Sequence, residues 1–377
     1  MTVKKSIVLV TFSPLLPVRQ GDSAYMFGFA RVLRAHGWQI HIVHYHLDYQ
    51  PGDYDAIRAH CDSLVVCRPT VPPPVNPRTA RLDDWCPKAL DEAVSAMVAR
   101  RRPGVLFVQY SFLSRCLEAA TERATVKVLD TDNIFSDRQA SFAAAGIEEN
   151  WVSPTRQEEA AAYRRADVLI AVQEREAREV AAMAPGIPVV LMPAMVETID
   201  AQNADGDQIL VVGNDNAHNL EGLRRFITMG WPRVRAAKPD ARIVIAGRLG
   251  RHFATEAGVT DAGVLEDLTD LYRESAIVLN PTPCGTGLKR KTVDALSHGK
   301  CLVSTPAGVE GLEGYPGTHI VAHTPEAFAT LIVALMNERH TIRRIGSNAI
   351  AFSRWYFDPD SVLARFENQV SRASRRV

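Results

Sequence analysis

The sequence predicts an α/β fold built from two doubly wound parallel-sheet domains. The chain has 377 residues, which is long for a single hydrophobic core. Short β-branched apolar runs alternate with helical patterns, as is typical of parallel strands joined by crossover helices. A polar stretch without apolar periodicity, Glu197–Asp207, separates two such series and is expected to link the domains.

The first series predicts an N-terminal domain over residues 1–196. Its apolar runs predict strands, and the amphipathic stretches between them predict helices. The expected strands are Ile7–Thr11, Ile40–His44, Ser63–Val66, Val105–Val108, Val126–Leu129, Val168–Ala171 and Val189–Met192, and the expected helices are Ser23–His36, Pro87–Arg101, Arg156–Arg165 and Glu174–Met183.

The second series predicts a C-terminal domain over residues 197–354. Ligands of such sheets bind beyond the carboxyl ends of the strands, and two such domains are expected to make a cleft. The expected strands are Ile209–Val212, Arg242–Ala246, Ala276–Asn280 and Cys301–Ser304, the expected helices are Leu220–Ala237, Asp267–Glu274 and Thr292–His298, and further helices begin near Pro325, Ile342 and Pro359.

Composition and charge exclude several classes of protein. Lys plus Arg and Asp plus Glu both total 43, so the formal net charge is zero, which argues against a nucleic-acid partner. No apolar stretch reaches the ~18–20 residues needed to span a bilayer. The basic residues Arg100–Arg102 and Arg372, Arg375 and Arg376 are interpreted as solvated surface. The alternative is peripheral contact at the inner membrane face or contact with a polyanionic acceptor.

The cysteine pattern indicates a reducing compartment. The six cysteines are scattered, without the spacing of a zinc site, and several lie in apolar runs where Cys behaves as a small hydrophobe. The N-terminal apolar run stops at Ser13–Pro14 and is interpreted as a first strand rather than a signal peptide. We therefore expect a cytoplasmic protein without a metal site.

The stretch Pro281–Gly311 carries the clearest chemistry. It combines a glycine-rich turn with Lys289 and Lys291, a helical run with Asp294, and a second glycine-rich turn. Glycines let the backbone approach a phosphate, and a helix N-terminus presents N–H groups to it. Lysines add positive charge, and an acid on the helix accepts hydrogen bonds from a sugar. The segment therefore predicts a site for a nucleotide diphosphate joined to a sugar.

The same stretch resembles the donor-site signature of retaining glycosyltransferases with the GT-B fold, the group-1 or family-4-like class. The segments ILVVGNDNAHNLEGLRRF, ARIVIAGR, VLDTDNIFSDR and YRRADVLIAVQEREAREV also resemble members of this class. The residues that carry the signature are Gly285, Gly287, Lys289, Lys291, Asp294, Ala295, Leu296, Gly299 and Thr305.

The resemblance implies two Rossmann-like domains facing across a cleft, with a C-terminal helix of about residues 355–377 crossing back to the first domain. It also implies a nucleotide-diphosphate sugar as donor substrate, retention of anomeric configuration, no cofactor and no essential metal. The acceptor would be a carbohydrate, a lipid-linked glycan or a small molecule.

On the donor side, the resemblance places cations where charge develops on the leaving diphosphate. Lys289, Lys291 and Arg248 are expected there, with either lysine left open as the phosphate contact, and Asp294 is expected at the ribose. Thr286 replaces an acid that the class often carries, and Asn219 is expected to cap a helix or to contact the ligand. The expected donor-binding residues are Gly213, Asn214, Gly247, Gly263, Val264, Leu265, Gly285, Thr286, Gly287 and Leu288.

The acceptor side is expected in the first domain. Asp130 and Asp132 follow a strand, and we favour an acceptor-binding or turn role over a metal role for them. Asp22 is equally well read as a helix cap. The expected acceptor-side residues are Gly21, Asp22, Gln109, Tyr110, Asp130 and Asp132.

Three other functions can be compared with the transferase. A nucleotide-sugar epimerase of the same fold would need a base against the sugar, and none is convincingly placed. A dinucleotide-dependent oxidoreductase would need a G-x-G-x-x-G turn after the first strand, where the sequence reads Phe12 to Pro17 without glycine. A non-catalytic sugar-binding protein would keep the fold but not the chemistry.

Overall fold

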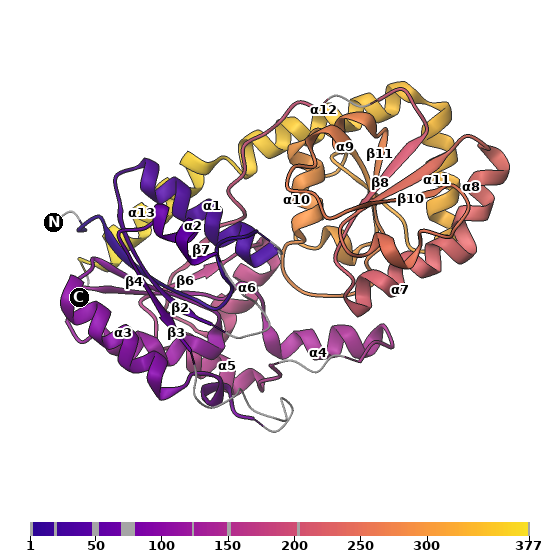
Figure 1. Ribbon diagram of the computed structural model, residues 1–377. Coiled ribbons are helices and arrows are strands. Elements are labelled where there is room, and N and C mark those ends of the chain that lie inside the picture. The colour runs from indigo at the N-terminus through magenta and orange to yellow at the C-terminus, as the bar shows by residue number, and fades with distance from the viewer. Residues whose placement is uncertain are drawn as a thin grey trace. The chain divides into compact units, whose positions relative to one another are not determined.

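A computed structural model of the chain describes residues 3–18, 21–46, 53–68, 80–122, 124–148, 152–201 and 204–375. The chain divides into two compact units. Unit 1 comprises Met1–Ala140, Glu148–Met195 and Pro359–Val377, and unit 2 comprises Ser141–Ile147 and Val196–Asp358. Each unit contains a parallel sheet with helices packed on it (Figure 1), so the predicted α/β class is confirmed.

Within the described residues, unit 1 contains a seven-stranded parallel sheet in the order β3-β2-β1-β4-β5-β6-β7. The order reverses between β1 and β4, which marks the place where ligands bind in doubly wound sheets. The strands are β1 (Ser6–Thr11), β2 (Gln39–Tyr45), β3 (Ser63–Cys67), β4 (Val105–Gln109), β5 (Val126–Asp130), β6 (Val168–Ala171) and β7 (Val189–Leu191).

Helices cover both faces of this sheet because successive residues of a buried strand point to opposite sides. Val8 and Val10 of β1 pack in one cluster with Leu90 and Val94 of α3. The helices and 3₁₀ segments of unit 1 are α1 (Gly21–Ala35), α2 (Tyr54–Ala59), η1 (Leu82–Trp85), α3 (Lys88–Arg101), η2 (Ser111–Ala119), α4 (Phe135–Ala144, whose end belongs to unit 2), α5 (Arg156–Tyr163), α6 (Glu174–Met183) and α13 (Pro359–Ala373).

The last helix, α13, packs against the start of the chain. Phe366 contacts Phe29 of α1, with ring centroids 5.3 Å apart. Glu367 accepts a hydrogen bond from Trp38 Nε1 at 2.8 Å and pairs with Lys5 at 3.0 Å. In Figure 1, α13 and α1 accordingly lie together in unit 1.

Unit 2 contains, in the part of the chain described, a six-stranded parallel sheet in the order β10-β9-β8-β11-β12-β13. Its order reverses between β8 and β11. The elements are β8 (Gln208–Val212), α7 (Ala217–Arg225), η3 (Phe226–Gly230), α8 (Trp231–Ala237), β9 (Arg242–Ala246), η4 (Gly250–His252), β10 (Val259–Gly263), α9 (Thr269–Glu274), β11 (Ile277–Asn280), α10 (Arg290–Ser297), β12 (Cys301–Ser304), η5 (Ala307–Val309), β13 (Ile320–Val321), α11 (Pro325–Asn337) and α12 (Arg339–Tyr356).

The predicted helix Leu220–Ala237 is interrupted by a π-helical stretch, η3. Trp231 N donates to the carbonyl oxygen of Phe226, five residues earlier. Pro232 follows directly, and its ring cannot donate and would clash with a carbonyl one turn back. The wider turn accommodates this proline.

Several short elements escaped prediction, each for a local reason. Strand β10 carries Thr260 and Asp261, both exposed, at the edge of its sheet. Segment η2 follows Tyr110, whose φ of 73° lies in a region that non-glycine residues rarely adopt. Apolar periodicity in a sequence identifies neither an edge strand with polar residues nor a turn that depends on a non-glycine residue with positive φ.

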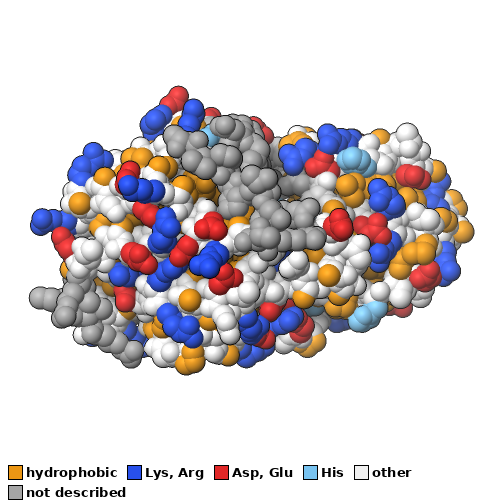
Figure 2. Space-filling view, turned by 90° about the horizontal axis from the view of Figure 1, so that it is seen from below, with side chains coloured by type: hydrophobic (Ala, Val, Ile, Leu, Met, Phe, Trp, Pro, Cys, Tyr) orange, Lys and Arg blue, Asp and Glu red, His pale blue; other side chains and the backbone are white. Residues whose placement is uncertain are grey.

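The surface carries both signs of charge. Figure 2 shows Lys and Arg side chains interspersed with Asp and Glu on the described part of one face. This agrees with the balanced totals of 43 and 43. None of the helices in the described ranges is long and apolar enough to cross a membrane.

Candidate functional site

The backbones that follow β8 and β9 are in close contact at two glycines. Gly247 has a φ of +100°, and a Cβ there would lie 2.3 Å from the carbonyl oxygen of Gly213. Leu249 N also donates to the Gly213 oxygen at 3.2 Å. The expected donor-side residues Gly213 and Gly247 therefore form one tight backbone edge, in which no other residue type fits at position 247 without displacing it.

A polar network joins this edge to the end of β11 and the start of α10. The Oδ1 atom of Asn219 accepts hydrogen bonds from Thr282 Oγ1 at 3.2 Å and from Lys291 Nζ at 2.5 Å. Lys291 Nζ also donates to Thr282 Oγ1 at 2.8 Å. Asn219 Nδ2 donates to the carbonyl oxygen of Asn214 at 3.0 Å. Lys291 is thus placed at the switch point between β8 and β11.

The idea that Asn219 caps a helix is wrong. Helix α7 begins at Ala217, and Asn216 caps it by accepting from Asn219 N at 3.2 Å. The Asn219 side chain is thereby left for the network. Sequence reasoning missed Thr282, although its place after β11 is the same signal that identified Arg248 after β9.

The electrostatics of Lys291 are unusual for a lysine. Both hydrogen-bond partners that the structure gives its amine are uncharged oxygens, on Asn219 and Thr282. Burial and then repulsion by Lys289 lower the pKa of Lys291 to about 7. An anion beside this amine would favour its charged form.

Lys289 has a different role in the same turn. Its Nζ donates to the carbonyl oxygens of Thr286 at 3.1 Å and Gly287 at 2.9 Å, and lies 3.5 Å from Glu310 Oε2. The Lys289 and Glu310 side chains are only 12% and 14% exposed. Lys289 therefore already has an acidic partner, and its hydrogen bonds stabilise the glycine-rich turn. Glu310, in the second glycine-rich turn, was not predicted.

The glycine-rich turn is held in conformations that glycine adopts readily. Gly285 and Gly287 have φ values of +123° and +75°. The turn leads through Leu288 and Lys289 to the N-terminus of α10. Just behind it, Thr292 donates to the carbonyl oxygen of Gly308 at 2.6 Å and accepts from Asn280 at 3.0 Å. These buried bonds tie the start of α10 and the second glycine-rich turn to the end of β11.

Arg248 lies in a separate cation cluster after β9. It pairs with Asp215 at 3.0 Å, and Arg251 contacts the same carboxylate. The hydrogen bond from Arg248 lowers the pKa of Asp215. Two arginines thus share one acid at the carboxyl edge. Arg251, three residues after Arg248, was not predicted.

Asp294 and the loop after β10 complete the predicted donor side. Asp294 Oδ1 accepts from Arg290 Nε at 2.7 Å, one helical turn earlier. Gly263 has a φ of +70°, and it is followed by two apolar residues in solvent, Val264 and Leu265, with 74% and 46% exposed. The structure therefore gives Asp294 an internal partner and leaves Val264 and Leu265 accessible.

In unit 1, the predicted acceptor-side residues meet at the switch point between β1 and β4. Gly21 opens helix α1. Beside it, Asp22 accepts from Tyr110 OH at 2.9 Å, from Ser23 N at 2.8 Å, and from Ser13 Oγ. Asp22 thus connects the segments after β1 and β4.

Two more of these residues, Gln109 at the end of β4 and Asp130 at the end of β5, carry unsatisfied polar groups. Asp130 is fully buried, and its Oδ2 atom has no hydrogen-bond partner in the described part of the chain. The same holds for Nε2 of buried Gln109, whose Oε1 accepts from Phe12 N at 3.3 Å. Asp132 has a φ of 51°. Burial and then Asp132 raise the pKa of Asp130, and such unsatisfied groups are typical of ligand sites.

The pKa of Asp132 gives a testable pH dependence. Burial and then the Asp22 charge raise this pKa to about 7, whereas an unfolded Asp titrates near ~3.9. Between about pH 4 and 7, the folded state therefore holds a proton that the unfolded state has lost, and stability falls as pH rises through this window, by up to about 1.4 kcal/mol per unit. In Asp132→Asn, the thermal midpoint should fall less between pH 5 and 7 than in the wild type.

Asp55→Asn is the matched control, because the Asp55 side chain is 96% exposed. Its midpoint should follow pH as in the wild type. Identical pH profiles for Asp132→Asn and the wild type would contradict a raised pKa at Asp132.

Comparison with known families and proteins agrees with the geometry of unit 2. Residues 206–338 match the family of group 1 glycosyl transferases. A curated relative from Klebsiella pneumoniae, described as an uncharacterized 44.6 kDa protein in the cps region, is 27% identical over 189 residues, or 46% of this chain and 48% of that protein. The match thus spans about half the length of the curated relative.

Solved structures resemble the chain over nearly its whole length. Sucrose-phosphate synthase from Thermosynechococcus elongatus has a TM-score of 0.75 at 14% identity, covering 99% of this chain and 100% of that one. The Anabaena protein Alr3699/HepE in complex with UDP has a TM-score of 0.73 at 12% identity, covering 97% and 100%. At these identities, the likeness shows the fold. Together with the family match, it confirms the predicted resemblance to GT-B group-1 glycosyltransferases.

Proposed function

We propose that this protein, whose residues 206–338 match group 1 glycosyl transferases, is an enzyme that transfers a sugar from a nucleotide-diphosphate sugar to a hydroxyl acceptor. The observation that carries the proposal is Lys291: a partly buried amine with uncharged partners stands beside a glycine-rich turn at the carboxyl edge of the unit 2 sheet. The diphosphate of the donor would supply a negatively charged partner for this amine.

In this reaction, the bond between the anomeric carbon and the distal phosphate oxygen breaks, and negative charge grows on the departing diphosphate. Lys291 and the N-terminus of α10 would stabilise that charge, with Arg248 as a second cation. Lys289 would act indirectly, since it holds the turn through the carbonyl oxygens of Thr286 and Gly287.

The finer mechanism follows from the same residues and from the resemblance. We propose metal-independent transfer, and the support is that these cations and the helix N-terminus could take the charge that a metal takes elsewhere. Retention of the anomeric configuration is proposed from the likeness to the class alone. The configuration of the product, read by NMR, tests it.

For the donor, we propose a UDP-sugar. The Anabaena protein with the same fold was solved with UDP. Val264 and Leu265 are apolar and exposed beside the end of β10, where a base would gain contact area. Asp294 would reach the ribose if it exchanged its bond with Arg290 for one with a hydroxyl.

For the acceptor, we propose a molecule rich in hydroxyl groups, such as a glycan, a glycolipid or a glycosylated natural product. The support is the group of carboxylates Asp22, Asp130 and Asp132 in unit 1, where Oδ2 of buried Asp130 lacks a donor among the described residues. Action in the cytoplasm, with peripheral contact at the inner membrane face, belongs to the same proposal.

A nucleotide screen tests the donor site. UDP, GDP, ADP, TDP and CMP would be compared by thermal shift, without metal and then with Mg²⁺ or Mn²⁺. UDP should raise the unfolding temperature without metal, because a ligand at a hundred times its dissociation constant adds roughly 2.7 kcal/mol. UDP-sugars that bind would then be assayed for transfer and hydrolysis.

The outcomes separate the candidate functions. Binding without transfer or hydrolysis would favour a sugar-binding protein, and interconversion of the donor sugar would favour an epimerase. A higher unfolding temperature with another nucleotide instead of UDP would change the proposed base of the donor. An unfolding temperature that no nucleotide changes, with or without metal, would contradict the proposed donor site.

A further inference from the structure

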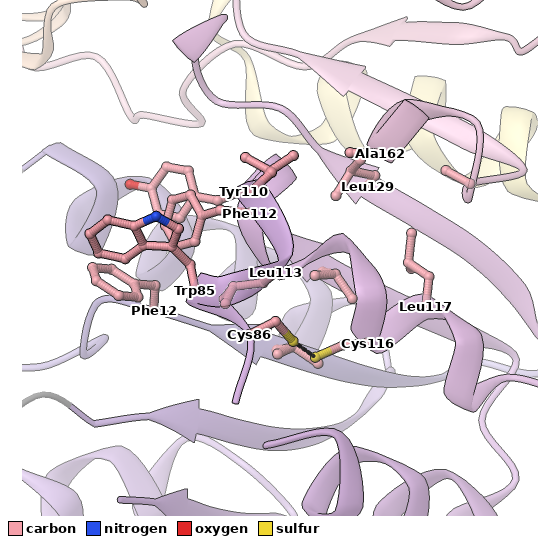
Figure 3. Packing of buried hydrophobic residues seen from close by; sticks show 14 of the residues in the cluster. Phe12, Trp85, Cys86, Tyr110, Phe112, Leu113, Cys116, Leu117, Leu129 and Ala162 are labelled. Atoms are coloured by element: carbon pink, nitrogen blue, oxygen red, sulfur yellow. Dashed lines mark hydrogen bonds between the residues drawn. The ribbon is translucent and has the colours of Figure 1, made fainter. Parts of the chain in front are cut away.

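A second polar cluster lies inside unit 1 and is made of residues that have no role in the sites described above. Cys86 follows η1, Asp91 lies in the first turn of α3, and Cys116 lies in η2. The two Sγ atoms are 3.4 Å apart. Asp91 Oδ1 lies 3.3 Å from Cys86 Sγ and 3.7 Å from Cys116 Sγ. In Figure 3, the two cysteine side chains point toward one another within the apolar cluster.

We propose that Cys86, Asp91 and Cys116 form a binding site for a zinc ion. Thiolate and carboxylate are both zinc ligands, and these three ligand atoms all lie within 4.8 Å of one another. Tetrahedral zinc with ordinary bond lengths would hold its sulfur and oxygen ligands roughly 3.6–3.8 Å apart. The three measured edges are close to one face of that tetrahedron, so side-chain shifts of a few tenths of an ångström suffice.

Arg115 orients the carboxylate for this role. Its Nε and Nη2 lie 2.8 Å and 2.7 Å from Asp91 Oδ2, so that Oδ1 is turned to the thiols. A partner that fixes a ligand in this way is common behind metal sites. Two thiolates and one carboxylate carry three negative charges, which a divalent ion and Arg115 together neutralise. Such a balance is needed because the two cysteines are almost fully buried.

An ion can reach the cluster from solvent, and its binding is coupled to the loss of the thiol protons. Cys86 and Cys116 are 2% and 1% exposed, whereas the Asp91 side chain is 29% exposed and opens the cluster to solvent. The ligand form of cysteine is the thiolate, so binding of the ion would release the thiol protons.

Two thiols this close also suggest a disulfide, but the surroundings favour the metal. Disulfide exchange requires attack by a thiolate, which a neighbouring carboxylate repels. The same carboxylate is what a cation needs. The ion would tie η1, α3 and η2 together just after Tyr110, and its role would be structural. The thirty-residue separation of the two cysteines hid this site from a search for zinc spacings.

The test uses the full chain, kept reduced with a phosphine and freed of metal by a chelator. Cobalt(II) is the probe, because its thiolate complexes absorb where zinc complexes do not. One equivalent should give thiolate-to-cobalt charge-transfer bands that zinc abolishes, and zinc should raise the unfolding temperature. Cys116→Ser should lose the bands, and Asp91→Asn should weaken binding at least tenfold.

Cys61→Ser is the matched control, since Cys61 is a buried free cysteine of unit 1 outside the cluster. It should bind cobalt as the wild type does. A folded wild type without the bands, or bands of unchanged affinity in Cys116→Ser and Asp91→Asn, would overturn the proposal. A metal-free sample that has lost two hydrogens in mass without reductant would overturn it in favour of a disulfide.

Discussion

Replacing Lys291 by methionine should lower the rate of sugar transfer by roughly 10²–10³-fold, the usual effect of removing a group that stabilises charge on the reacting atoms. Methionine keeps the length and apolar contacts of the side chain but cannot carry charge. Asn219 and Thr282 would lose a donor, while Lys289 would still hold the turn through two carbonyl oxygens. A transferase assay with UDP-sugar at saturation measures the loss.

The lowered pKa of Lys291 gives this prediction a second readout. At pH 8, a lysine of pKa about 7 is mostly neutral, and a bound diphosphate would raise that pKa. UDP binding should therefore take up on the order of one proton, seen by calorimetry in buffers of different ionisation enthalpy. Lys291→Met should abolish the uptake. Uptake that persists in this variant would assign the phosphate contact to another group.

Lys238→Met serves as the control for both measurements. Lys238 lies in unit 2 at the C-terminal end of α8, outside the site. Its variant should retain transfer and proton uptake. A comparable loss in both variants would indicate a general effect of removing a lysine from unit 2.

The sheets could be predicted because their strands are buried on both faces. Runs such as Ile7–Thr11 and Arg242–Ala246 lie within observed strands, since continuous β-branched runs bounded by turn residues are a strong local signal. Strand β10 was missed because it is a polar edge strand. The break at η3 was missed because a single proline is a weak signal inside an otherwise periodic helix.

The candidate site was predictable in position but not in its internal partners. The sequence placed Lys289 and Lys291 on one glycine-rich turn, but left open which contacts a phosphate. The structure separates them by their partners, a carboxylate at Lys289 and uncharged oxygens at Lys291. Those partners, Glu310 and Asn219, lie 21 and 72 residues away in the chain. Pairings over such distances depend on tertiary packing, which spacing does not encode.

Replacing Gly247 by alanine should cost about 3 kcal/mol or more in the free energy of unfolding of unit 2, at the upper end of the range for single substitutions. Two effects add: a φ of +100° is strained for alanine, and its Cβ would lie 2.3 Å from the carbonyl oxygen of Gly213. The clash is with backbone, so it cannot be relieved by a rotamer change. Because Gly213 would have to move, UDP binding should fall with stability.

The Gly263→Ala variant separates the cost of backbone strain from the cost of a steric clash. Gly263 also has a positive φ, +70°, but a Cβ there would meet no atom within 4 Å. This variant should lose only roughly 1–2 kcal/mol, the cost of the left-handed conformation for alanine. Denaturant unfolding of the three proteins measures the difference. Equal losses in the two variants would mean that the contact between β8 and β9 yields freely, and the rigid backbone edge inferred for the donor site would then be wrong.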